Sequence, residues 1–171
     1  MTTAMVTPAW VRMMAEYNAA MNRDLYDAAA ALDDTERKRE RGAFWGSIHA
    51  TFSHLLWADT MWMSRIAGWD RPAVGLKQSG TLEDDFATLS RRRAETDAGL
   101  SAWAAGVAAA WLEGEISWFS GAIQRDVTRP RALIVTHLFN HQTHHRGQVH
   151  ALLTQCGQRT GDTDLFILVA A

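Results

Sequence analysis

The sequence contains only one cysteine, Cys156, and only three prolines among 171 residues. A single cysteine excludes an internal disulfide, and nothing in the composition indicates an oxidising compartment, so we expect a cytoplasmic protein. No run of about eighteen apolar residues is present that would span a membrane. The N-terminal residues also lack the basic and apolar regions of a signal peptide. We therefore expect no membrane partner.

An excess of charge of one sign is also missing. The 17 basic and 19 acidic residues give a net charge of −2. Binding to nucleic acid needs basic residues gathered into a patch or stripe, so we expect no nucleic-acid partner. The charged run 33–41 alternates in sign, which is typical of a solvated helix face. A hydrophobic content of 47% is enough for one core, and residues 1–171 are predicted to form a single domain.

Long stretches with little glycine or proline, separated by short segments rich in these residues, predict four helices. They run from Pro8 to Leu32, from an acidic cap around Asp34 through a kink near Gly42 to Gly68, from Thr81 to about Gly106, and from Pro130 to Gly157. This pattern predicts an all-α protein with the fold of a four-helix bundle.

The segments between the helices carry turn and cap signals. Thr81 followed by Asp84 resembles a capping box, and Thr128 is a candidate cap for the last helix. The β-branched and aromatic residues of segment 113–127 surround Gly121, which predicts a short hairpin before the last long helix. The apolar tail 164–171 is expected to pack on the bundle as a last turn or an extended strand.

All seven histidines fall into two short windows of the sequence. On a helical wheel of about 100° per residue, the apolar face of the last helix includes His141 and His145. Their i,i+4 spacing lets two imidazoles converge on one ion. The flanks of that face hold His137 and His144, while His150 points away. The wheel therefore selects the pair His141 and His145.

A metal ion would bind the ring nitrogens of this inward-facing pair, which would otherwise lack polar partners. An unsatisfied buried polar group costs about 1–3 kcal/mol, and a divalent metal accepts the lone pairs of both rings. The alternative is that the pair consists of core or surface histidines with ordinary hydrogen bonds, which is the more common case for an isolated HxxxH. A third histidine from the second helix would complete a three-histidine site with open positions. Periodicity alone leans towards His49 over His54 as that third ligand.

The sequence disfavours several enzyme classes. Gln142 stands where a zincin protease has the glutamate of HExxH, and an amide cannot act as a base at neutral pH. The sequence has no GxSxG elbow, Walker loop or GxGxxG. Cys156 lies late in a helix without an activating charge, so we expect a small buried hydrophobe and not a nucleophile.

Three blocks of the sequence resemble the DinB family, the DinB/YfiT-like four-helix bundles with a three-histidine metal site. They are RGAFWGSIHATFSHLLWADTMWMSRIAG (41–68), HLFNHQTHHRGQVHALLTQCG (137–157) and TDL (163–165). The resemblance implies that His54, His141 and His145 bind a divalent transition metal, with zinc or nickel as the first expectation. It favours His54 over His49, because a helix that is apolar nearly all round gives the wheel little power to discriminate.

Further residues then take supporting roles. His49 becomes a packing residue or a neighbour of the ligands. Asn140, His144 and Gln148 are candidates to hydrogen-bond the outer nitrogens of the ligating rings. Asp59 is a candidate acid or base, and a solvated or structural carboxylate is at least as well supported. Arg146 can steer an anionic substrate or lie on the exposed face, and we favour the exposed face.

Related bundles include metal-dependent thiol S-transferases and a thiol-dependent maleylpyruvate isomerase. The resemblance therefore implies an enzyme that activates a thiol or water at the metal, with a small-molecule substrate and a low-molecular-weight thiol as partners. The alternative is a non-catalytic, metal-stabilised stress-response or interaction bundle, because no Glu or Asp lies within one helical turn of the histidine pair. We also expect a homodimer.

Overall fold

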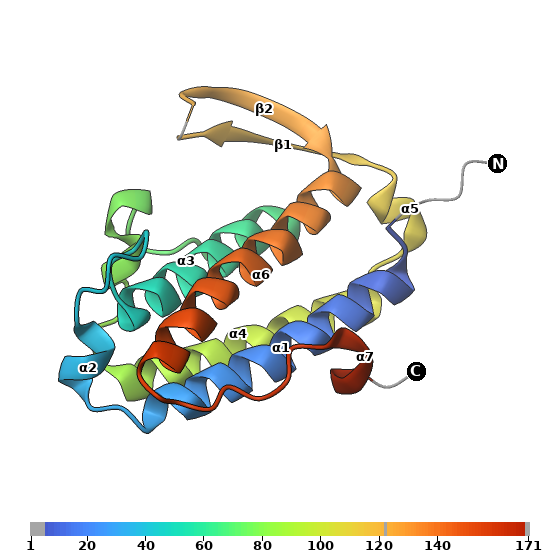
Figure 1. Cartoon of the computed structure of the whole chain (residues 1–171). Helices are drawn as coiled ribbons and strands as arrows, with labels where there is room; N and C mark the ends of the chain where they lie inside the picture. The colour runs from blue at the N-terminus through green and yellow to red at the C-terminus, as the bar shows by residue number, and fades with distance from the viewer. Residues whose placement is uncertain (1–5, 122, 170–171) are drawn as a thin grey trace.

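The computed structural model describes residues 6–121 and 123–169. Four long helices dominate it, α1 (Pro8–Ala30), α3 (Ile48–Ile66), α4 (Phe86–Gly106) and α6 (Arg131–Gln155). Helix α1 packs on α4 and α6, and α3 packs on the same two helices, so the four surround a common core (Figure 1). This arrangement confirms the predicted four-helix bundle. No helix in the described ranges is both long and apolar enough to cross a membrane.

Shorter elements connect the long helices. They are α2 (Asp34–Lys38), the 3₁₀ helix η1 (Leu76–Thr81), α5 (Ala109–Leu112), the strands β1 (Glu115–Ser120) and β2 (Arg125–Pro130), and α7 (Leu165–Leu168). The strands form an antiparallel hairpin that lies outside the bundle beside α3 and α6 (Figure 1). The predicted hairpin is thus confirmed. Of the two forms expected for the tail, the structure contains the helical turn, α7, which contacts α1.

The prediction of one long helix from Asp34 to Gly68 is wrong. The chain forms α2, a loop over residues 39–47, and then α3. Gly42 and Gly46 have φ angles of +72° and +83°, a left-handed conformation that a helix does not contain. Ser47 then starts α3, since its hydroxyl accepts a hydrogen bond from the Ala50 amide.

Two predicted caps are also wrong. Helix α4 begins at Phe86 and not at Thr81, because the Asp85 carboxylate accepts the Thr88 amide and thereby caps it. Thr128 does not cap α6 but lies in β2, where its hydroxyl is 2.7 Å from that of Ser117. In contrast, α1 begins at Pro8 as predicted.

The core is divided along the bundle axis into two apolar clusters. One contains Val11, Met63, Leu100, Leu138 and Phe139 among its buried residues. The other contains Leu25, Phe52, Leu56, Leu89 and Val149. On each of the four long helices, buried polar residues lie between the parts that contribute to the two clusters: Asn18 and Asn22 on α1, Asp59 on α3, Arg93 and Asp97 on α4, and Gln142, His145 and Arg146 on α6. A polar layer therefore crosses the middle of the bundle.

Candidate metal centre

Three histidines from two helices meet at this polar layer, to which His145 belongs. His54 comes from α3, and His141 and His145 come from successive turns of α6. One ring nitrogen from each lies within 4.8 Å of those of the other two. The Nε2 atoms of His54 and His141 are 3.3 Å apart. The packing of α3 on α6 thus brings together the three histidines that the family resemblance selects.

The spacing of one pair of these nitrogens matches that of two ligands of a metal ion. Zinc binds imidazole nitrogen at about 2.0–2.1 Å, so two ligands of a tetrahedral ion lie roughly 3.3 Å from each other. The separation of 3.3 Å between the Nε2 atoms of His54 and His141 agrees with that value. Three imidazoles form a donor set that suits zinc, nickel, iron or copper. The geometry agrees with the prediction that these residues bind a metal.

The outer nitrogens of two of the rings have hydrogen-bond partners. His145 Nδ1 lies 2.8 Å from Gln148 Oε1, as predicted, and because an amide oxygen only accepts, Nδ1 carries the proton. The lone pair of His145 Nε2 is then free for the centre. His54 Nδ1 lies 2.8 Å from the hydroxyl of Ser79, a buried residue of η1. Ser79 was not predicted, because the glycine-rich loop that contains it has no periodicity to indicate which residue faces α3.

A tryptophan covers part of the cluster, and burial changes the protonation of its rings. The Trp45 ring stacks on His54 with 4.0 Å between ring centres. Burial, and secondarily the charges of neighbouring histidines, lower the pKa of both His54 and His141 to about 3. Burial also lowers the pKa of His145. At neutral pH the three rings are therefore uncharged, which is the form that binds a metal.

A family model for the DinB family matches residues 2–169. The chain belongs to the DinB family. A comparison with curated proteins finds no match. Membership in the DinB family and the three-histidine cluster together fit a metal-binding protein.

The other histidines of this DinB-family chain lie outside the cluster. His49 is buried, and its Nε2 is 2.7 Å from the carbonyl oxygen of Glu83. The preference that periodicity gave to His49 over His54 is therefore wrong, because His54 is the histidine of α3 that lies in the cluster. His137 packs edge-on against Trp62. His144 is exposed and lies near Gln148. His150 lies beside the hydroxyl of Thr160.

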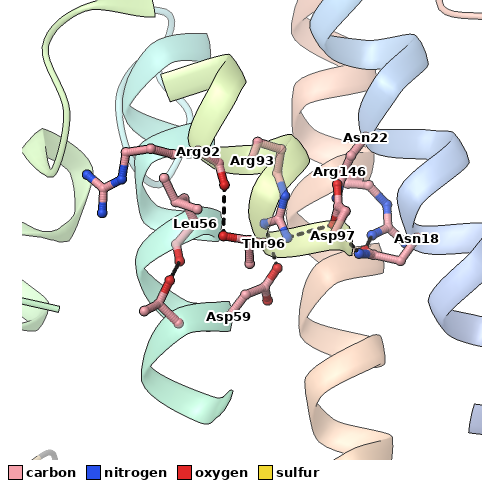
Figure 2. A network of polar contacts seen from close by, with 10 residues as sticks. Asn18, Asn22, Leu56, Asp59, Arg92, Arg93, Thr96, Asp97 and Arg146 are labelled. Atoms are coloured by element: carbon pink, nitrogen blue, oxygen red, sulfur yellow. Dashed lines mark hydrogen bonds and ion pairs between the residues drawn. The ribbon is translucent and has the colours of Figure 1, made fainter. Parts of the chain in front are cut away.

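Asp59 is a structural carboxylate, one of the roles considered for it beside that of an acid or base. Its carboxylate is buried and accepts a hydrogen bond of 2.7 Å from the Arg93 guanidinium. Burial raises the pKa of Asp59, and the Arg93 charge opposes that rise. Figure 2 shows how Arg93 also reaches Asp97, which in turn accepts a hydrogen bond from Asn18. Asp59 therefore belongs to the polar layer of this DinB-family bundle.

The prediction that Arg146 lies on the exposed face is wrong. Only 3% of this residue is exposed, and its guanidinium donates to the Asn18 amide oxygen and to the Thr143 hydroxyl. Arg93 is likewise buried. Each buried arginine has a partner on another helix, Asp59 for Arg93 and Asn18 for Arg146. Cys156 is half-buried against the second apolar cluster, so it is less buried than predicted.

Proposed function

We propose that this protein is a metal-dependent enzyme that uses His54, His141 and His145 to activate a thiol or water for attack on a small electrophilic substrate. The observation that carries the proposal is that the cluster holds three donors, without a fourth His, Cys, Asp or Glu from the described ranges. Structural zinc sites usually have four protein ligands, whereas catalytic sites have three. When bound, a divalent metal lowers the pKa of a thiol or water in its remaining position.

The residues around the cluster prepare it for this chemistry. Gln148 fixes the tautomer of His145, and Ser79 holds the outer nitrogen of His54. Trp45 covers one face of the His54 ring and keeps water away from it. Low pKa values keep the rings neutral, so the ligands need not lose protons at neutral pH before they bind.

The site supports a thiol better than water as the nucleophile. The nearby carboxylate, Asp59, is paired with Arg93, so it is not free to act as a general base. A free thiol has a pKa of about 8.5, whereas bulk water has one of about 15.7. Activation of a thiol therefore needs much less help from a base. We accordingly favour a reaction of the thiol S-transferase type with a low-molecular-weight thiol.

A thiol-consumption assay tests this proposal. Metal-free protein and protein loaded with zinc or nickel are incubated with cysteine, glutathione or coenzyme A and the electrophile 1-chloro-2,4-dinitrobenzene. We expect metal-dependent conjugation by wild type and by His144→Ala, an exposed neighbour of the site, and none by His141→Ala. Equal rates in the metal-free and loaded proteins for every thiol and both metals would contradict the proposal.

A second candidate is a non-catalytic bundle in which the metal only stabilises the fold. Its support is that the cluster joins α3 to α6, so a bound ion would cross-link two helices. A metal that binds only the folded state raises its stability by mass action. If zinc raises the melting temperature of wild type but not of His145→Ala, and no thiol is consumed by either protein, this second candidate replaces the first.

A further inference from the structure

A cavity of about 340 Å³ lies between α1 and α6, on the side of α6 that faces away from the histidine cluster. Its lining includes Tyr17 and Met21 of α1, Thr143, Arg146 and His150 of α6, and Thr163 of the segment that precedes α7. Residues 143, 147 and 150 lie about half a turn of helix from His141 and His145. The cavity, called the α1/α6 cavity below, is therefore separate from the candidate metal centre.

The α1/α6 cavity contains a buried positive charge that no carboxylate contacts directly. Arg146 is 3% exposed, and within the described ranges it forms no ion pair. Its partners are neutral oxygens of Asn18 and Thr143, and its guanidinium carbon lies 5.6 Å from the centre of the Tyr17 ring. Among the described residues, its hydrogen bonds lead to a carboxylate one step away, since Asn18 bridges Arg146 to Asp97 (Figure 2). The charges of Asp59 and Asp97 also act on Arg146 through space.

Arg93, the other buried arginine of the polar layer, differs from Arg146 in its partners. Arg93 contacts two buried carboxylates directly, Asp59 and Asp97, each at 2.7 Å. Both carboxylates are thus already engaged with Arg93, and none of the residues that line the α1/α6 cavity is acidic. Arg146 lines the α1/α6 cavity and has only neutral direct partners, so its positive charge favours an oxyanion there. The planar N–H donors of a guanidinium match a carboxylate or phosphate.

The rest of the lining suits an organic ligand. Met21 and Tyr17 add apolar surface to the lining, and Thr143 and His150 add polar side chains, which also bond to the protein itself. The wall formed by the C-terminal segment is fixed, because the Tyr17 hydroxyl donates a 2.8 Å hydrogen bond to the Thr163 carbonyl. Figure 1 shows that this segment runs alongside α1. The volume falls within the range of about 300–1,000 Å³ found for small-molecule sites.

We propose that the α1/α6 cavity binds a small organic anion, whose carboxylate or phosphate pairs with Arg146 and whose apolar part lies against Met21 and Tyr17. The site needs neither a metal nor the proposed thiol chemistry. It is therefore tested on metal-free protein, and the result does not depend on the histidine cluster.

Thermal unfolding with three matched probes tests the charge requirement. Benzoate and phenyl phosphate carry the two anionic groups, and benzamide is their neutral counterpart. In a buffer free of carboxylates and phosphate, at about 100 times the dissociation constant, we expect benzoate or phenyl phosphate to raise the melting temperature by about 5–10 °C. Benzamide should not raise it. The larger of the two anion shifts identifies the group that the site prefers.

A pair of leucine variants on α6 tests the location. A Cβ atom added at Gly147, which lines the cavity, would meet no heavy atom within 4 Å besides its chain neighbours and the backbone of its own helix. Gly147→Leu therefore adds a side chain at the cavity without a clash at its first carbon. Ala151→Leu adds the same side chain at an exposed position one turn later. We expect Gly147→Leu to lose the anion shift and Ala151→Leu to keep it. Arg146→Gln should lose it as well.

The proposal is overturned if neither anion raises the melting temperature more than benzamide does. It is equally overturned if Gly147→Leu remains folded and keeps the full anion shift. Because Gly147→Leu leaves the buried network of Arg146 intact, the test holds even where Arg146→Gln unfolds.

Discussion

The Nε2 atoms of His54 and His141 lie 3.3 Å apart, although 87 positions separate the two residues in the sequence. Their proximity results from the packing of α3 on α6, and it creates a small volume into which imidazole nitrogens point. Two protonated rings at this distance would repel each other, and burial removes the water that would screen them. The geometry thus favours neutral rings. This affects how the stability of the protein depends on pH and how tightly the site binds a metal.

The first consequence is that acid destabilises the metal-free protein. Below about pH 6.5 the unfolded chain takes up protons at His54 and His141, whereas the folded chain does so only near pH 3, because burial lowers the pKa of each to about 3. The free energy of unfolding should therefore fall as the pH is lowered from 6.5 towards 3. Urea denaturation between pH 7 and pH 4 measures this decrease.

The variant His141→Ala provides the control for that experiment. It lacks one of the two histidines whose pKa is lowered by burial. The slope of its free energy of unfolding against pH should therefore be smaller than that of the wild type, by the amount that corresponds to about one bound proton per molecule. Parallel pH profiles for the variant and the wild type would show that His141 is not held neutral by burial.

The residues that hold the outer nitrogens should control metal affinity. Ser79→Ala and Gln148→Ala each remove one hydrogen bond of 2.8 Å to a ring of the cluster. Loss of such a partner typically weakens metal binding by about 10- to 100-fold. Zinc titration by calorimetry measures the change, with Gln155→Ala at the exposed end of α6 as the matched control. Affinities equal to that of the control would rule out an orienting role for Ser79 and Gln148.

Arg93 should contribute far more to stability than Arg91, two positions earlier on α4. Removing Arg93 leaves the buried carboxylates of Asp59 and Asp97 without their shared cation, which should cost about 3–5 kcal/mol. Arg91 and Glu95 form an exposed i,i+4 pair, so Arg91→Ala should cost about 0.5 kcal/mol or less. Chemical denaturation of Arg93→Ala and Arg91→Ala compares the two. Similar losses would mean that the buried network does not stabilise the bundle.

The sequence allowed the helices to be predicted where strong local signals mark their ends. Pro8 starts α1, and Gly157, with a φ of +75°, ends α6 as expected. The break between α2 and α3 could not be predicted in the same way. An isolated glycine costs a helix only about 1 kcal/mol, so Gly42 and Gly46 are compatible with a kinked helix as well as with a loop.

The burial of Arg93 and Arg146 could not be predicted because it depends on partners that are remote in the sequence. Arg146 donates to Asn18, which is 128 positions away, and neither residue carries a local signal for the other. A charge at an isolated position predicts exposure, since burial without a partner is costly. The polar layer reverses that expectation only because four helices supply its members together.

The histidine cluster was predictable in part. The i,i+4 spacing of His141 and His145 selected that pair from periodicity alone, and the structure places both rings in the cluster. Periodicity favoured His49 over His54 wrongly, because α3 is buried over most of its circumference and gives the wheel little power to discriminate. The family resemblance, which compares whole motifs, pointed to His54.

The metal content of the purified protein tests the central claim most directly. Protein prepared without a nickel column is incubated with excess zinc, freed of unbound ions and analysed by plasma mass spectrometry. A three-histidine site predicts about one zinc ion per chain for wild type and for His144→Ala, and close to none for His141→Ala. Wild-type protein without zinc, or His141→Ala with as much zinc as the wild type, would contradict the account.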